Sequence, residues 1–336
     1  MRISVLPSMR RIWKKFPRNN RFIPMRFDTF RINNPISSGW YADPEARFYE
    51  GKFWIYATVS CGYRMQKNMV CFSSADLENW EQHDDILDLS TMPWVWRAHW
   101  APTIVEKNGL YYFIYASNDI QSDDEVGGLE LCVSDSPAGP FRCVLNRPLV
   151  DKFHNGAQPI DAHLFKDDDG TVYLFYGGWG HCNMCVMNDE MNGLKPFEDG
   201  TFFREITPKD YVEGPCMFKR AGKYYFMWSS GCWENDTYRV NAAFADTPCG
   251  PFENPVNILC TGDSTFANGP GHNGYLYLEN QDLYLNVYHR HSNEVEHRNA
   301  RFLCIDVMEF DLAGNIKPVT MTNSWRYEKG SVIIEG

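Results

Sequence analysis

The sequence lacks the long apolar runs that a membrane helix or a secretion signal requires. Basic side chains interrupt its first 33 residues at Arg10, Arg11, Lys14, Lys15, Arg18 and Arg21. A signal peptide needs an unbroken apolar stretch of about 7–15 residues, and a membrane helix needs about 20. We therefore expect a cytoplasmic protein without a membrane partner.

The sequence also lacks a disulfide framework and a helical pattern. Its 11 cysteines are odd in number and irregularly spaced, in a chain of 336 residues that far exceeds the small scaffolds usually stabilised by disulfides. We therefore expect reduced thiols. No long stretch repeats apolar residues at helical spacing, which argues against a helical fold.

Positive charge is scarce outside the N-terminal segment. Residues 1–33 hold nine Lys or Arg and one acidic residue, a net charge of +8, and because the whole chain carries −11 the remainder carries −19. Such a body repels phosphate backbones, so we expect no nucleic-acid partner and a neutral substrate. We interpret residues 1–33 as a basic N-terminal extension: a subunit-contacting arm, a partly disordered tail or an extension without function. The sequence does not indicate the oligomeric state.

What the chain does have is a repeat. Five times, a short apolar strand is followed by a polar turn, usually with glycine, and then by a strand rich in aromatic residues, which is typical of a β-hairpin. The repeats read YADPEARFYEGKFWIYAT from Tyr41, APTIVEKNGLYYFIYAS from Ala101, DAHLFKDDDGTVYLFYGG from Asp161, EGPCMFKRAGKYYFMWSS from Glu213 and GHNGYLYLENQDLYLNVYH from Gly271.

The spacing of the repeats predicts the fold class. Turn-like segments such as SDSPAGPF from Ser134 and ADTPCGPF from Ala245 follow about 30 residues after a repeat start and indicate an outer strand. Units of four short strands repeated every 50 to 60 residues are typical of propellers, whose radial closure protects the sheet edges. We predict an all-β, five-bladed β-propeller over residues 34–336, with no second domain.

A propeller brings equivalent positions of its blades together. The innermost strand of each blade runs along the central channel, so Asp43, Asp161, Glu213 and His272 should meet at one end of the axis. Clustered carboxylates repel one another and lose hydration, which makes them poor structural residues. The alternatives are strand-opening turns for Asp43 and Glu213, backbone contacts for Asp161, and an ordinary interior role for His272.

Two carboxylates facing each other across a pocket are what glycoside hydrolysis requires, one to donate a proton and one to activate water. The motifs YADP at Tyr41, WAP at Trp100, IDAHLF at Ile160, VEGP at Val212 and GPGH at Gly269 fit this chemistry. In this order and spacing the chain resembles glycoside hydrolase family 43, the five-bladed pentosidases and arabinanases. The resemblance runs from about residue 34 to the C-terminus.

The resemblance implies roles for single residues. Asp43 matches the general base, Glu213 the general acid, and Asp161 the aspartate that modulates the pKa of the acid, in a family that inverts anomeric configuration. His272 matches a central histidine that in some members faces a calcium ion, so we expect no required cofactor but a Ca²⁺ near the channel as a candidate. Arg301 resembles an arginine that reaches a sugar hydroxyl.

Substrate contacts and specificity follow from the same motifs. Trp40, Trp100 and Trp233 lie beside pocket-facing motifs and could stack on a sugar. Long segments after the first, second and fifth hairpins favour a closed pocket. We predict an exo-acting enzyme that releases terminal β-D-xylose or α-L-arabinofuranose from short plant-derived oligosaccharides. A five-bladed glycoside phosphorylase and a non-catalytic propeller that serves as an interaction module are the competing hypotheses.

Overall fold

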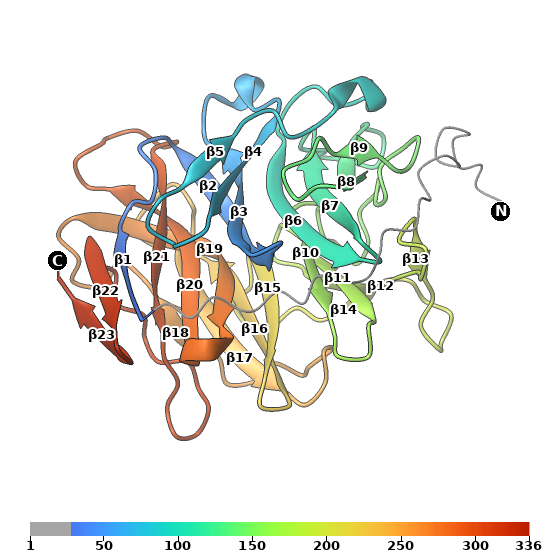
Figure 1. Ribbon diagram of the computed structural model, residues 1–336. Coiled ribbons are helices and arrows are strands. Elements are labelled where there is room, and N and C mark those ends of the chain that lie inside the picture. Colours follow the sequence, from blue (N-terminus) through green and yellow to red (C-terminus); the bar gives the residue numbers. More distant parts are fainter. Residues whose placement is uncertain (1–27, 336) are drawn as a thin grey trace.

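A computed structural model describes residues 28–335, and five antiparallel sheets form the blades of its propeller (Figure 1). The predicted all-β, five-bladed architecture is confirmed. The blades comprise, in chain order, β2 (Tyr41–Tyr49), β3 (Lys52–Val59), β4 (Met69–Ser74) and β5 (Glu81–His83); β6 (Trp100–Lys107), β7 (Leu110–Ser117), β8 (Gly128–Ser134) and β9 (Arg142–Cys143); β10 (His163–Lys166), β11 (Val172–Tyr176), β12 (Asn183–Met187), β13 (Leu194–Lys195) and β14 (Arg204–Glu205); β15 (Glu213–Arg220), β16 (Lys223–Ser230), β17 (Arg239–Ala245) and β18 (Val256–Leu259); and β19 (Ala267–Leu278), β20 (Leu283–Ser292) and β21 (Arg301–Met308). The short helices are η2 (Tyr63–Met65), η3 (Leu89–Thr91) and η4 (Glu279–Gln281).

A sixth small sheet joins the two ends of the described chain. Strand β1 (Thr29–Asn33) pairs with β22 (Ser324–Glu328), which pairs with β23 (Ser331–Ile334). Buried Phe30, Ile32 and Trp325 pack this sheet into the apolar cluster shared by the first and last blades. The predicted boundary at residue 33 is therefore too late, because the apolar Phe30 and Ile32 attach β1 to the propeller. Residues 1–27 of the predicted extension lie outside the described residues.

Tryptophan burial, cysteine pairing and membrane-spanning helices can be checked in the structure. Trp54 and Trp228 are buried in the aromatic layers between sheets. All 11 cysteines are unpaired, as expected. Between residues 28 and 335, no helix is both long and apolar enough to cross a membrane.

Each inner strand begins with the same local distortion. At or just after each repeat start, one residue has a positive φ: Asp43 (54°), Ala101 (46°), Asp161 (55°), Gly214 (65°) and His272 (37°). In four of the blades the pairing register shifts at this point, as in a β-bulge. A bulge redirects a side chain and is common beside active sites. The distortion therefore turns these positions toward the end of the channel.

The equivalent position in the fourth blade is Gly214, one residue after the glutamate that the repeat alignment placed there. This correction has a physical reason, because the positive φ belongs to the residue in the bulge and not to Glu213, which precedes it. The Glu213 side chain consequently leaves the strand from a different position than Asp43 and Asp161. It is partly exposed, whereas Asp43 and Asp161 are only 8% and 5% exposed.

A buried charged cluster joins the inner strands of the first three blades just past the bulges. Glu45 forms ion pairs with Arg47 and with His163, whose Nδ1 lies 3.0 Å from Oε2 of Glu45. The hydroxyl of Thr103 donates to the same carboxylate at 2.8 Å. Burial alone would raise the pKa of Glu45, but the charges of Arg47 and His163 hold that pKa below its ordinary value.

Candidate active site

Asp43 is held by four neighbours. The hydroxyl of Thr58 donates to Oδ2 at 2.8 Å, and the Arg301 guanidinium donates to Oδ1 at 3.3 Å. Nδ1 of His272 lies 3.5 Å from the same Oδ1. The Asp43 backbone N–H donates to Nδ1 of His289 at 3.1 Å. Arg301 and His272 thus lie beside the Asp43 carboxylate and orient it.

Asp161 and His272 form the middle of the site. Nδ1 of His272 lies 3.3 Å from Oδ2 of Asp161, and the same oxygen accepts the Gly214 N–H at 3.1 Å. Burial alone would lower the pKa of His272, but the carboxylates of Asp161 and Asp43 raise it to about 9. His272 is therefore an imidazolium at neutral pH, and it offsets the repulsion between the two aspartates.

Glu213 has the properties of a proton donor. Burial, followed by the Asp161 carboxylate, raises its pKa to about 7. The Tyr238 hydroxyl donates to Oε1 at 2.8 Å, so one carboxyl oxygen is anchored by the protein and the other can face a substrate. A carboxylic acid that is half protonated at neutral pH can both donate a proton and recover it.

The predicted residues Asp43, Asp161, Glu213 and His272 are thus brought into one connected cluster. Sequence reasoning missed Thr58 and Tyr238. A signal for Thr58 was present, because two of the repeats carry a hydroxyl residue, Thr58 and Ser229, at the penultimate position of the second strand. Thr58 accepts the Ala101 N–H, and Ser229 accepts the His272 N–H, each at 2.8 Å. Tyr238 stands outside the repeat phrase and had no such signal.

Arg301 and Trp233 line the site beside Asp43. The guanidinium carbon of Arg301 lies 4.7 Å from the centre of the Trp233 ring, and its Nε donates to Ser60 at 3.0 Å. Arg298, by contrast, lies at the surface, where it pairs with Glu234 at 2.9 Å. Arg301, the predicted arginine, is therefore the one that contacts the Asp43 carboxylate.

The other two predicted tryptophans lie near the cluster but contact no carboxylate in it. The Trp40 carbonyl accepts the Ser60 N–H at 2.9 Å, and the Trp40 ring lies 4.8 Å from that of His297. Trp100 precedes the bulge residue of the second blade and donates through Nε1 to Gln66 at 2.6 Å. Both rings are partly exposed. They remain predicted substrate contacts.

The segments predicted to surround the mouth are joined across blades. In the first and second blades, the Tyr63 hydroxyl donates to Asp119 at 2.8 Å, and Gln158 donates to the same carboxylate at 2.9 Å. On the other side, Trp40 meets His297 across the first and last blades. A wall linked in this way favours a pocket over an open cleft.

The predicted Ca²⁺ can be tested against the side chains around His272. Its Nδ1 faces two carboxylates as a cation, and calcium prefers six to eight oxygen ligands. Among residues 28–335, no group of three or more His, Cys, Asp or Glu side chains is arranged to hold a metal ion. These side chains by themselves do not make a calcium site, and the Ca²⁺ stays a prediction.

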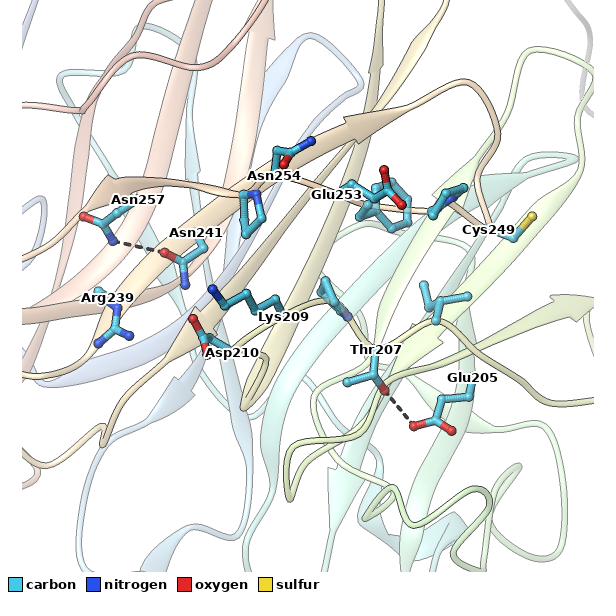
Figure 2. Close-up of a pocket in the computed structure, with 15 residues that line it drawn as sticks. Glu205, Thr207, Lys209, Asp210, Arg239, Asn241, Cys249, Glu253, Asn254 and Asn257 are labelled. Atoms are coloured by element: carbon cyan, nitrogen blue, oxygen red, sulfur yellow. Dashed lines mark hydrogen bonds between the residues drawn. The ribbon is translucent and has the colours of Figure 1, made fainter.

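A cavity lies away from the carboxylates (Figure 2). It has a volume of about 1070 Å³ between the third and fourth blades, and Glu205, Lys209, Asp210, Arg239 and Asn257 lie in its walls. None of the three site carboxylates lines it. Volume alone therefore does not identify the reaction centre, and the arrangement of titratable groups does.

Replacing Tyr238 with Phe should shift the alkaline limb of the activity profile. The hydroxyl stabilises the ionised form of Glu213, so its loss should raise the pKa of the acid by about one unit. The profile of kcat/KM against pH should move to higher pH on its alkaline side. Tyr115→Phe is the control, because the Tyr115 hydroxyl meets Met92 in the core. An unmoved limb in Tyr238→Phe would contradict this contact.

Comparison with known proteins gives a consistent set of relatives. The sequence model of Glycosyl hydrolases family 43 matches residues 32–316. A β-D-galactofuranosidase of Aspergillus niger is 38% identical over 329 residues, covering 95% of this chain and 94% of its own. A β-xylosidase of Xylanibacter ruminicola is 28% identical over 331 residues, covering 84% and 97%. A solved α-L-arabinofuranosidase of Clostridium thermocellum superposes with a TM-score of 0.67 at 25% identity, covering 85% and 96%.

Proposed function

This chain belongs to glycosyl hydrolases family 43, and on that premise we propose that it removes single terminal furanose residues from short oligosaccharides, with inversion. Asp43 is the general base, Glu213 the general acid, and Asp161 the group that keeps Glu213 protonated. The observation that carries the proposal is the contrast between the two ends of the cluster. Arg301 pairs with Asp43, whereas burial and Asp161 raise the pKa of Glu213 to about 7.

The contacts define the order of events. Asp43, held by Thr58 and Arg301, accepts a proton from water as the water attacks the anomeric carbon. Glu213 gives its proton to the leaving oxygen. Contacts link the two residues through His272 and Asp161 rather than by a direct hydrogen bond. Such a separation suits an inverting enzyme, whose carboxyl groups stand about 6.5–9.5 Å apart to admit water.

A furanose is the proposed sugar because one relative that matches 95% of this chain is named for a furanose. That relative is a β-D-galactofuranosidase at 38% identity. β-D-Galactofuranose and α-L-arabinofuranose share their ring configuration and differ in the length of the exocyclic arm. The predicted α-L-arabinofuranose is therefore kept beside β-D-galactofuranose. The predicted β-D-xylose, a six-membered ring, becomes the weaker alternative.

Exo action follows from the mouth of the site. The joined turns around Tyr63, Asp119 and Gln158 on one side, and around Trp40 and His297 on the other, leave a pocket suited to a chain end. Behind the site, the ion pair of Glu45 with His163 ties the inner strands of the first and third blades together, which argues against a polysaccharide passing through.

The test compares methyl β-D-galactofuranoside, α-L-arabinofuranoside and β-D-xylopyranoside, with and without phosphate. We expect free sugar from one or both furanosides, independent of phosphate, and proton NMR should show the inverted anomer first. Phosphate-dependent release of a sugar phosphate would establish the phosphorylase alternative. Faster cleavage of the xyloside would overturn the choice of sugar, retention would overturn the mechanism, and no cleavage at all would favour a non-catalytic propeller.

A further inference from the structure

A short turn carries an exposed tryptophan to the rim of the candidate site. The turn runs from residue 177 to 182, between β11 and β12. The Gly177 N–H donates to the Ile160 carbonyl at 3.0 Å, and the Gly180 N–H donates to the Val212 carbonyl at 3.2 Å. These two carbonyls belong to the residues just before Asp161 and Glu213. The turn is therefore bonded directly to the two strands that present these carboxylates.

The turn is tightly built. A Cβ on Gly177 would lie 2.1 Å from the His181 carbonyl oxygen, so only glycine fits there. The buried Tyr211 hydroxyl donates to the Gly177 carbonyl at 2.7 Å. At the apex, Trp179 has a φ of 58°, which is unfavourable for a bulky residue. Such a conformation persists only where the surrounding structure enforces it, and it is concentrated at ligand sites.

Trp179 contributes little to the core. It is 53% exposed and belongs to none of the buried apolar clusters of the described residues. Its ring centre lies 4.9 Å from that of Phe153, a partly exposed residue in the segment before the third blade. The Phe153 N–H is fixed by the Asp123 carboxylate at 2.8 Å. The two rings are tilted by 45° to each other, so Phe153 supports Trp179 and the exposed Trp179 ring offers the apolar face that can pack against a sugar.

We propose that Trp179, supported by Phe153, binds the leaving-group sugar, the second residue of the oligosaccharide. The inference rests on the proposed function. A general acid must lie within hydrogen-bond reach of the oxygen it protonates, so the second sugar begins beside Glu213. The Trp179 turn is bonded to the residue preceding Glu213, whereas Trp233 and Arg301 lie beside Asp43. Trp179 thus determines preference for the leaving group, and the rings beside Asp43 serve the sugar that is released.

The experiment compares Trp179→Ala with wild type on two substrates of the furanose that wild type cleaves: the methyl furanoside and the furanosyl disaccharide. Both have alcohol leaving groups that need protonation, but only the disaccharide reaches a second-sugar site. We expect kcat/KM for the disaccharide to fall about 10- to 100-fold, as for truncation of an aromatic at the centre of a contact. The loss on the methyl furanoside should be about tenfold smaller, and Trp179→Phe should recover most of the disaccharide rate.

Tyr277→Ala is the matched control. Tyr277 is 41% exposed and stacks on Tyr284 with ring centres 4.2 Å apart, but it lies near the C-terminal end of β19, away from the bulge at His272. It should change neither rate. Equal losses of Trp179→Ala on both substrates, or no loss on either, would overturn the inference while leaving the proposed function intact. Failure of wild type on both substrates would instead overturn the proposed function. Nitrophenyl glycosides are unsuitable here, because their aromatic leaving group could itself stack on Trp179.

Discussion

Asp43→Asn should abolish nearly all turnover on every substrate. Water must be deprotonated whatever group leaves, and an asparagine amide at this position cannot accept that proton. We expect kcat to fall by about 10²- to 10⁴-fold, the usual contribution of such a group. The loss should be the same on methyl, disaccharide and activated aryl furanosides. Substantial surviving turnover on any of them would contradict the role of Asp43.

A control for Asp43→Asn lies two residues further along the same strand. Glu45→Gln also removes a buried carboxylate, but one that pairs with Arg47 and His163 behind the site. Breaking a buried ion pair is costly, about 3–5 kcal/mol, so this variant should melt at a lower temperature. Its folded fraction should keep the wild-type kcat. The pair of variants separates loss of chemistry from loss of stability.

Glu213→Gln should discriminate between leaving groups. On the disaccharide, whose leaving oxygen needs a proton, kcat/KM should fall by about 10²- to 10⁴-fold. On a dinitrophenyl furanoside, whose leaving group departs as an anion, much more activity should survive. The alkaline limb set by the Glu213 pKa of about 7 should also disappear from the remaining profile. Equal losses on both substrates would count against Glu213 as the acid.

The same variant makes a prediction about stability. The folded-state pKa of Glu213 is raised from its ordinary 4.5 to about 7, so ionisation costs the folded protein stability as pH rises through this range. Below it, the carboxyl is protonated in both the folded and unfolded states and the cost is absent. Glu213→Gln should therefore raise the melting temperature above neutral pH and have little effect in acid. A lower melting temperature at alkaline pH would contradict the raised pKa.

The propeller fold and part of the site were predictable because the chain repeats one hairpin sequence pattern five times. A hairpin phrase that returns five times must pack against copies of itself, and radial closure is a stable way to protect the edges. Closure of the ring then brings equivalent positions of the blades to the axis. The sequence alone therefore predicts that three residues lie close together: Asp43, Asp161 and His272. In the fourth blade the repeat alignment placed Glu213 at the bulge position, which Gly214 occupies. The error is one residue, because an alignment of repeats does not show which of two neighbouring residues adopts the positive φ.

The remaining features depend on contacts between residues distant in the sequence. Arg301 reaches Asp43 across 258 positions, and Tyr238 reaches Glu213 from outside the repeated phrase. The pairing of β1 with β22, which moved the predicted boundary, likewise joins opposite ends of the chain.

The sequence by itself determined the propeller and the residue types at its centre, since strand patterning and repetition are local properties that can be counted along the chain. Only the tertiary structure decided which carboxylate is paired with an arginine, which is partly desolvated beside another carboxylate, and which tryptophan is held at the rim. Hydration and electrostatic neighbours set the pKa of each group, and both are fixed by the closing of the ring.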